Sequence, residues 1–437
     1  MSKLAGSLSV IVVAAALLGG CGSSSDDAPE QSAAGAGSGP VPEPKEPVTI
    51  SFASWVGQER GMKALYKTFK AEHPNITVEF QNIPAEEANR KLTTQIAGGN
   101  PPDTAYLDSG TIADFGSREA LVNLDAYIDR SDLVKKDDFV APFRATTEFD
   151  GSMFALPFDG ESTALFYRTD LFEAAGITDP PTTWEEFEAV AQQLTKPEEK
   201  QYGTILFSPS PESAYYWYPW LWQAGGELLS EDGKTVEFNS DAGKQAAEFY
   251  IGLTEYSPQD FLNSNSYDGR IAFARGTVGM YVAGAWLAGV LREEFPKIDG
   301  KWATAPLPEG AAGCGTTIAG DNLAILAGSE KRDAAWKWIE FLASEESQRA
   351  WTIDDPFGTL LPTRTKLLES PELAEKKPIM EGFAEAMKCG KPPVSNKDWP
   401  KIEERLSEQL GKSMYGEVAP ADAIDQAASE AQGIIGR

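Results

Sequence analysis

Two carboxylates in an apolar setting are the strongest candidates for chemistry in this sequence. Asp159 and Glu161 stand two residues apart in the segment ALPFDGESTALFY. At that spacing they share one face of a strand or flank a turn. Nearby carboxylates can act as the acid and base of a glycoside hydrolase, and they can also accept hydrogen bonds from sugar hydroxyls. A loop between two strands, without a chemical role, is the third interpretation.

Asp108 and Ser109 follow a predicted strand at 104–107. In open α/β sheets, ligands bind beyond the carboxyl ends of the strands, where a carboxylate can accept two hydroxyl hydrogen bonds. The alternative role of Asp108 is to cap the next helix. We treat both residues as candidate ligand contacts.

A dense aromatic run, YYWYPWLW, lies at 215–222. Adjacent aromatic residues on a helix point in different directions, so some are expected to face outward, where their rings could stack on a sugar. Helical spacing places Tyr216 and Trp220 on one face, and Trp217 is the third candidate. The two tyrosines do not indicate an iron site, because no set of His and carboxylate residues accompanies them.

Two further segments offer ligand contacts. Gly284 and Trp286 belong to the sequence GAW after a predicted strand at 278–282, which places an exposed indole beyond the strand. Arg364 follows LPT in a predicted loop, where it either contacts a ligand or is an ordinary surface arginine.

The overall composition excludes several classes of function. The chain of 437 residues has 38 Lys and Arg against 66 Asp and Glu, a net charge of −28. A field of that sign disfavours nucleic acids and anionic lipid surfaces. A single histidine, His73, leaves no His-rich metal site and weakens any catalytic triad. The sequence also lacks the motifs of serine hydrolases, P-loop NTPases and zinc proteases, so we expect neither an enzyme nor a cofactor.

The N-terminus has the pattern of a bacterial lipoprotein signal. Lys3 precedes an apolar run at 8–18, and the small residues before Cys21 resemble a lipobox. So short a run cannot cross a hydrocarbon core of roughly 30 Å, which indicates a cleaved signal and not a permanent span. The sequence predicts a signal peptide at 1–20, lipidation of Cys21 and attachment to the outer face of the bacterial cell membrane. A buried cysteine in an ordinary N-terminal helix is the alternative.

The segment 21–47, from the lipidated cysteine onward, is expected to be a disordered linker. Residues 22–47 contain no aromatic residue, and Val41 is their only aliphatic side chain larger than alanine. Such a composition cannot offset the entropy cost of ordering the chain. The folded body is therefore expected to begin near Val48.

Cys314 and Cys389 remain as a pair once Cys21 is used by the anchor. Two thiols that can meet in an exported protein favour a disulfide. Two separate buried thiols are the alternative, because the sequence alone does not show that these residues are close.

Hydrophobic periodicity predicts an α/β fold. Alternating apolar residues predict strands at 48–52 and 76–80, and apolar residues at helical spacing predict a helix at 62–69 between them. A strand–helix–strand unit of this length is typical of a parallel sheet covered by helices. The pattern recurs along the chain, and there are more elements than one sheet needs.

Several segments, taken in order, resemble family 1 extracellular solute-binding proteins of ABC transporters, in the branch of the maltose- and trehalose/maltose-binding proteins. They are the lipobox, SFASW with Trp55, NPPDTAYLD, LPFDGESTALFYRTDLFEAAGI, TTWEEF, WQAGG, FARGTVGMYVAGAW and LLPTRTKL. The resemblance covers residues 48–437. It implies a two-lobed periplasmic-binding-protein-like fold of type II, in which each lobe is a mostly parallel sheet flanked by helices and the ligand cleft lies at the hinge.

The resemblance also implies three chain crossings between the lobes, near 157–162, 306–316 and 354–362. Both lobes are then discontinuous. The expected bounds are 48–157 plus 316–355 for the N-terminal lobe, and 158–315 plus 356–437 for the C-terminal lobe.

Roles for individual residues follow from the same resemblance. In the related proteins the residue that corresponds to Asp108 binds sugar hydroxyls, and the carboxylate before the strand with sequence [FY]YR corresponds to Glu161. The tryptophan of the related G-x-W turn corresponds to Trp286, and the loop arginine after LP corresponds to Arg364. Arg90 matches the family pattern loosely, as the arginine that some relatives place before the second helix.

The resemblance implies a monomeric, lipid-anchored substrate-binding protein of an ABC importer. Its ligand is expected to be a neutral di- or trisaccharide, with α-glucosides as candidates, and its partners are the permease subunits in the membrane. The alternative is a secreted glycoside hydrolase that uses Asp108 with Asp159 or Glu161. Cleavage of the sugar would distinguish the hydrolase from the binding protein.

Overall fold

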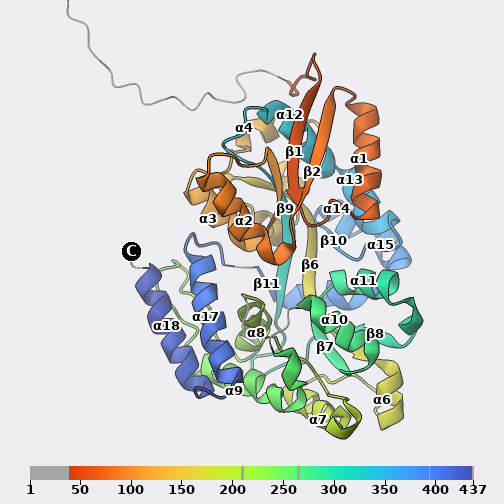
Figure 1. The fold of residues 1–437 in the computed structure, drawn as a ribbon, viewed down its shortest axis with the longest axis vertical. Helices are drawn as coiled ribbons and strands as arrows, with labels where there is room; N and C mark the ends of the chain where they lie inside the picture. Colours follow the sequence, from red (N-terminus) through yellow and green to blue (C-terminus); the bar gives the residue numbers. More distant parts are fainter. Residues whose placement is uncertain (1–38, 208–210, 263–265, 393, 436–437) are drawn as a thin grey trace, which may run out of the picture.

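A computed structural model describes residues 39–207, 211–262, 266–392 and 394–435 of the chain. It shows two lobes, drawn one above the other in Figure 1, that are connected by two long antiparallel strands, β6 (Ala155–Arg168) and β9 (Thr316–Ile325). The predicted two-lobed α/β fold is therefore confirmed. The predicted signal peptide at 1–20 and the lipidation site at Cys21 lie outside the described residues.

The end of the predicted linker packs on the N-terminal lobe, which corrects the expectation of disorder up to residue 47. Val41 is 3% exposed and belongs to the core of that lobe. The Glu43 carboxylate lies 2.8 Å from Nδ1 of His73. The average composition of the segment does not predict this packing, because it does not show that a single aliphatic side chain lies between two prolines. The prolines restrict the backbone and so lower the entropy cost of ordering it.

The N-terminal lobe is built on the predicted strand–helix–strand unit. β1 (Val48–Ser54) pairs in parallel with β2 (Ile76–Asn82), and α1 (Arg60–Glu72) connects them. On its other side β1 pairs in parallel with β3 (Thr104–Asp108), which in turn pairs antiparallel with β9. The carboxyl end of β3 therefore lies beside a strand that crosses to the other lobe.

A compact set of helices and one hairpin completes the N-terminal lobe around these strands. The elements are α2 (Ala85–Ala97), α3 (Ile112–Ser117), α4 (Asp125–Arg130), α5 (Ala141–Ala145), β4 (Glu148–Phe149), β5 (Ser152–Met153), α12 (Arg332–Leu342) and α13 (Glu345–Arg349). Apolar side chains such as Phe52, Leu323 and Trp338 form its main core.

In the C-terminal lobe β6 pairs antiparallel with β7 (Met280–Gly284) and with β8 (Trp302–Ala305). The expectation of a mostly parallel sheet is therefore wrong for the strands described in this lobe. The physical reason is that β6 enters from the N-terminal lobe, so its direction is set by the crossing, and the next strands return toward that lobe. As a result β7 ends at Gly284, opposite Thr163 of β6, near the junction of the lobes.

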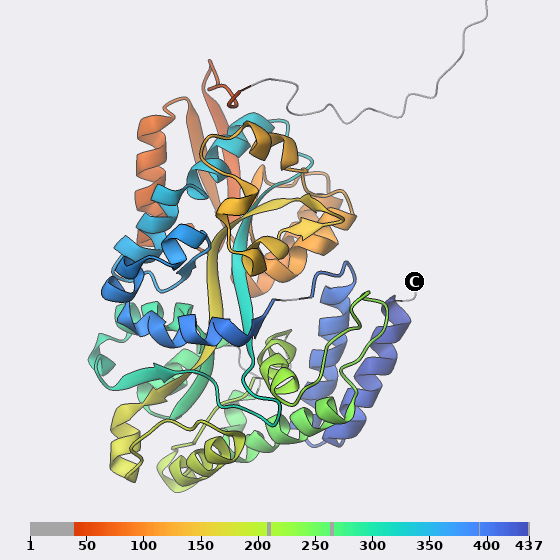
Figure 2. The same ribbon diagram turned by 180° about the vertical axis from the view of Figure 1, so that it is seen from behind.

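Helices pack around this sheet and along its junction with the N-terminal lobe, as Figure 2 shows from behind. They are α6 (Thr169–Ala175), α7 (Trp184–Leu194), α8 (Pro211–Gln223), α9 (Asp241–Gly252), α10 (Ser266–Arg275), α11 (Trp286–Glu294), α14 (Thr365–Leu368), α15 (Pro371–Lys376), α16 (Glu381–Ala386), α17 (Trp399–Met414) and α18 (Pro420–Ile435). The short strand β10 (Leu361–Pro362) pairs with β6 at Gly160 and Asp159. This lobe has its own hydrophobic core, and the lobe bounds given above remain a prediction. None of the helices in the described ranges is long and apolar enough to cross a membrane.

Cys314 and Cys389 form the predicted disulfide, with Cα atoms 6.0 Å apart. Cys314 precedes β9, and Cys389 precedes β11 (Gly390–Lys391), which pairs in parallel with the first residues of β9. The disulfide therefore holds β11 against β9 where β9 leaves the C-terminal lobe.

Candidate functional site

Four carboxylates lie on one face of the central sheet, where the strands pass between the lobes. The register places Asp108 of β3 opposite Asp321 of β9, and Asp321 opposite Asp159 of β6. Side chains that are directly opposite in an antiparallel pair share a face. Glu161 stands two residues after Asp159 on β6 and therefore shares that face. We call these four residues the carboxylate row.

Asp159 is the buried and best-bonded member of the row, with 1% of its surface exposed. The Tyr106 hydroxyl lies 3.0 Å from one of its carboxylate oxygens and 2.9 Å from the other, and the indole N–H of Trp351 donates to it at 2.7 Å. Burial raises the pKa of Asp159, although both hydrogen bonds favour the ionised form. This carboxylate is held in place by the fold itself.

Glu161 is the least satisfied member of the row. Its Oε2 atom is buried, and it has no hydrogen-bond partner among the described residues. Burial, followed by the charges of Asp108 and Asp159, raises the pKa of Glu161 to about 8. A buried carboxylate oxygen without a donor is costly, so this atom is poised to accept a hydrogen bond from a ligand.

Gly284 makes room for Glu161. A Cβ atom at this position would lie 2.2 Å from Oε2 of Glu161 and 2.7 Å from Cδ1 of Trp286. The predicted site residues Glu161, Gly284 and Trp286 are therefore brought together by the end of β7 and the start of α11. The position tolerates glycine alone unless the carboxylate or the indole moves.

Asp108 has the capping role that the sequence suggests, and it remains a candidate ligand contact. Its carboxylate accepts a hydrogen bond from the backbone N–H of Gly110 at 2.8 Å and so caps a single turn at Ser109–Thr111, yet its side chain remains exposed. The Ser109 hydroxyl, by contrast, is buried, donates to the Gly320 carbonyl and accepts from the Asn322 side chain. Ser109 thus ties the turn to β9, and its hydroxyl is already used within the fold.

Three half-buried aromatic residues accompany the carboxylate row. The Trp55 ring meets the Tyr106 ring edge to face, with centroids 4.7 Å apart. Trp286 begins α11 beside Glu161. Tyr215, the first residue of the aromatic run, lies close enough to Glu161 that this charge, after burial, raises the pKa of its phenol well above the usual value.

The three candidates that the sequence offered in the aromatic run are core residues, which corrects the prediction. Tyr216, Trp217 and Trp220 are 5%, 0% and 1% exposed and belong to the core of the C-terminal lobe. The reason is that α8 packs between α9, α17 and β9, so a central helix buries adjacent aromatics on several sides. Helical spacing alone could not show that Tyr215 is the residue of this run that reaches Glu161.

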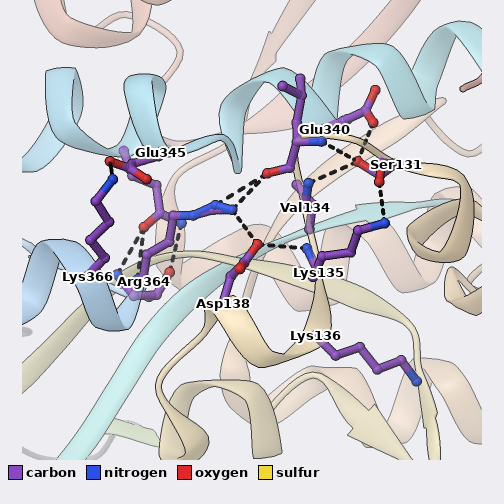
Figure 3. Close-up of polar contacts among 12 residues, drawn as sticks. Ser131, Val134, Lys135, Lys136, Asp138, Glu340, Glu345, Arg364 and Lys366 are labelled. Atoms are coloured by element: carbon purple, nitrogen blue, oxygen red, sulfur yellow. Dashed lines mark hydrogen bonds and ion pairs between the residues drawn. The ribbon is translucent and has the colours of Figure 1, made fainter.

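Arg364 is used within the fold. It is 5% exposed, and its guanidinium donates to the Leu133 carbonyl and to the Asp138 carboxylate, both at 2.8 Å (Figure 3). It lines a surface hollow of about 810 Å³ that no member of the carboxylate row lines. Arg90, on α2, is 75% exposed and lies 3.5 Å from Glu87. The structure brings neither arginine into contact with the row.

Sequence reasoning missed three residues of the site: Asp321, Tyr106 and Tyr215. Asp321 is a charged residue inside an otherwise buried strand, which is a signal that could have been used. Tyr106 stands two residues before Asp108 and therefore shares its face. Among the described residues no group of three or more His, Cys, Asp or Glu side chains is arranged to hold a metal ion.

Comparison with known proteins identifies the family of this chain. The family model for bacterial extracellular solute-binding proteins matches residues 53–349. A binding protein of Brucella abortus (strain 2308) is 30% identical over 302 residues, which is 67% of this chain and 70% of that protein. A maltotriose-binding protein of Pyrococcus abyssi is 24% identical over 366 residues, which is 82% of this chain and 76% of that protein.

Solved structures have the same two-lobed architecture. An ABC transporter solute-binding protein from Thermotoga lettingae, bound with α-D-tagatose, superposes with a TM-score of 0.82 at 25% identity, covering 89% of this chain and all of that one. The predicted type II fold is therefore confirmed, as is the resemblance to sugar-binding members. The chain belongs to the bacterial extracellular solute-binding protein family, among the sugar-binding proteins of ABC transporters.

Proposed function

We propose that this protein is the lipid-anchored receptor of an ABC importer and captures a neutral di- or trisaccharide between its two lobes. The carboxylate row carries this proposal, because it lies where β6 and β9 pass between the lobes. Carboxylate oxygens accept hydrogen bonds from sugar hydroxyls, and aromatic rings stack on the apolar faces of sugars. Trp55, Tyr215 and Trp286 supply such rings beside the row.

The same residues indicate the charge of the ligand, and the name of a relative supports its size. No ion pair of the row with a Lys or Arg occurs in the described part of the chain, so a phosphate or carboxylate on the ligand would meet only repulsion. Maltotriose is what the Pyrococcus abyssi relative is named for, which supports an oligosaccharide and makes α-glucosides the first candidates.

Membrane attachment and delivery to a permease rest on the lipobox at Cys21 and on the family. A Cys21→Ala variant should be found free in the medium, whereas the wild-type protein should fractionate with the membrane. Equal release of both proteins would contradict the anchor. Wild-type cells should take up the cognate sugar, and deletion of this protein should abolish that uptake.

Binding is tested by thermal denaturation and calorimetry with maltose, trehalose and cello-oligosaccharides. A ligand that binds the native state raises its melting temperature. We expect the cognate sugar to raise the melting temperature of the wild-type protein and to raise that of Glu161→Gln less or not at all. The control Glu185→Gln, which changes an exposed acid of α7, should show the same rise as the wild type. Chromatography of the sugar should show no cleavage. Cleavage that is lost in Glu161→Gln would identify a glycoside hydrolase in place of a receptor.

A further inference from the structure

A β-bulge in β6 lies directly before the two carboxylates of that strand. Pro157 stands opposite Asn322, and Asp159 stands opposite Asp321, so two steps along β6 correspond to one step along β9. Phe158 is therefore the extra residue of the bulge. The proline agrees with this irregularity, because proline inside a strand that is paired on both sides is found at bulges.

The bulge decides which face of the sheet Asp159 and Glu161 occupy. Successive side chains of a regular strand point to opposite faces, and a shift of one residue moves every following side chain to the other face. Regular pairing after Pro157 would place Phe158 opposite Asp321. Asp159 and Glu161 would then point to the other face, away from the members of the carboxylate row on β3 and β9. The row is therefore assembled by one extra residue in β6.

Tyr106 on β3 contacts two consecutive residues of β6. Its ring meets the Phe158 ring edge to face, with centroids 6.2 Å apart, and its hydroxyl lies 2.9 Å from a carboxylate oxygen of Asp159. Consecutive side chains of a regular strand point to opposite faces and would not both meet one tyrosine. These contacts show that the bulge brings Phe158 and Asp159 to the same face.

Gln348 on α13 contacts the bulge with its side-chain amide, which is 0% exposed. The Nε2 atom donates to the Pro157 carbonyl at 3.0 Å and to the Thr363 hydroxyl at 2.8 Å. The Oε1 atom accepts from the backbone N–H groups of Thr363 and Arg364 at 3.1 and 3.2 Å. Two donors and two acceptor sites are the full capacity of this amide. A change of pairing at Pro157 would leave part of a buried network without partners, which is costly.

Thr363 and Trp351 contact the same bulge. Thr363 follows β10, and its hydroxyl donates to the Pro157 carbonyl at 3.2 Å. Trp351, on the π-helical turn after α13, donates its indole N–H to Asp159 at 2.7 Å and stacks on the Phe158 ring with centroids 5.6 Å apart. The residues before, in and after the bulge are thus all held from outside β6. We call Gln348, Trp351 and Thr363 the bulge clamp.

We propose that the bulge clamp consists of positioning residues of the sugar site: it fixes the bulge in β6 and so keeps Asp159 and Glu161 on the face that carries the rest of the carboxylate row. Its members are 0%, 5% and 0% exposed, so they act through β6 and not by contact with the sugar. This inference rests on the proposed function and names the residues that set the geometry of its site.

Two buried threonines allow a matched test of the clamp. Thr363→Val removes the hydroxyl that bonds the Pro157 carbonyl, whereas Thr363→Ser keeps it. Thr352→Val is the control, because the Thr352 hydroxyl is also buried but donates at 2.7 Å to the backbone carbonyl of Gln348 and not to β6.

Calorimetry with the cognate sugar gives the first measurement. We expect Thr363→Val to bind about tenfold more weakly than the wild type, the scale of one lost buried hydrogen bond, and Thr363→Ser and Thr352→Val to bind within about twofold of it. Urea denaturation should show similar losses of stability in the two valine variants, so a general loss of stability would not explain the difference in affinity. Equal affinities in the two folded valine variants would overturn the proposal.

Two tryptophans give a second matched pair. Trp351→Phe keeps an aromatic ring beside Phe158 but loses the N–H that bonds Asp159. Trp338 is also buried, and its indole nitrogen has no hydrogen-bond partner among the described residues, so Trp338→Phe loses no such bond. We expect sugar affinity to fall severalfold in Trp351→Phe and to stay unchanged in Trp338→Phe. The same affinity in both folded variants would remove Trp351 from the clamp.

Amide hydrogen exchange of β6 tests the clamp without any sugar. We expect the peptide that covers residues 155–163 to exchange about tenfold faster in Thr363→Val than in the wild type, and at the wild-type rate in Thr352→Val. If the wild-type protein binds no sugar of the panel, the proposed function fails, while faster exchange in Thr363→Val still shows that the clamp fixes the bulge. If sugar binds but neither measurement separates the two valine variants, the clamp is overturned and the sugar receptor stands.

Discussion

The Tyr106 hydroxyl reaches across β9 to lie 3.0 and 2.9 Å from the two carboxylate oxygens of Asp159. Tyr106 is on β3 and Asp159 is on β6, and β9 lies between these strands. The contact therefore links the two strands that flank β9. The Tyr106 hydroxyl and the Trp351 indole N–H are the side-chain groups that hydrogen-bond this buried carboxylate.

Removal of this hydroxyl should destabilise the protein. We expect Tyr106→Phe to lower the free energy of unfolding by about 1–3 kcal/mol, because a buried acceptor loses its donor. Urea denaturation measures the change. Tyr127→Phe is the matched control, since the Tyr127 hydroxyl also bonds an aspartate, Asp333, but that carboxylate is exposed. Equal losses in both variants would contradict the special role of Asp159.

Gly284 should be intolerant of a side chain. In Gly284→Ala the new methyl group would collide with Oε2 of Glu161, so we expect sugar affinity to fall by about 1–3 kcal/mol as the carboxylate is displaced. Gly252→Ala is the control, because no atom lies within 4 Å of a Cβ atom at that position. Calorimetry that finds the same affinity in both variants would place Glu161 outside the binding site.

Substitutions of two tryptophans should have different effects, one on sugar affinity and the other on the free energy of unfolding. Trp286→Ala should weaken sugar binding by about 1–3 kcal/mol, the scale of one stacked aromatic side chain, with little change in unfolding. Trp217→Ala should lower the free energy of unfolding by about 3–5 kcal/mol, because a fully buried indole leaves a cavity. Calorimetry and denaturation of both variants test this. Unchanged sugar affinity in Trp286→Ala would show that Trp286 does not contact the sugar.

The ligand-free protein should lose stability as the pH rises from 5 to 8. Folded Glu161 has a pKa of about 8, above that of an unfolded glutamate, so the folded state holds a proton that the unfolded state releases. The contribution is greatest at low pH and is lost as the pH rises through the folded pKa, with a slope of up to about 1.4 kcal/mol per pH unit.

Denaturation of Glu161→Gln at several pH values checks the assignment of this slope. The variant should show a shallower dependence than the wild type, because glutamine does not titrate, and Glu185→Gln should keep the wild-type slope. Identical slopes in all three proteins would show that Glu161 ionises with an ordinary pKa.

The disulfide should contribute to stability in the exported protein. Closure of a loop of 75 residues by Cys314–Cys389 should be worth about 2–4 kcal/mol, so replacing both cysteines by serine should lower the free energy of unfolding by that amount. Reductant should destabilise the wild type and leave the double variant unchanged. Peptide mapping without reduction should recover the two cysteines in one linked peptide.

Local patterns in the sequence predicted several features that the structure confirms. The strand–helix–strand unit of β1, α1 and β2 follows from hydrophobic periodicity, which depends on residues close together in the chain. The pairing of Cys314 with Cys389 was predicted from the count of cysteines and from the predicted export signal. Asp159 and Glu161 stood out because charged residues interrupt an apolar strand.

Contacts between distant segments decided the rest. Asp108, Asp159 and Asp321 come together through the pairing of β3 and β6 with β9, and that register cannot be read from any one of the strands. Which aromatic ring of 215–222 reaches the row depends on how α8 is enclosed by α9, α17 and β9. Likewise Arg364 looked free in a loop until the fold placed Asp138 beside it.

The sequence by itself determined the chemical types available to this protein: many carboxylates, many aromatics, one histidine and three cysteines. Only the tertiary structure decided which of those carboxylates lie without cations and which of those rings are covered. The physical reason is that residue type sets what a side chain can bind, whereas burial and the distance to other charges set whether it is left free to do so.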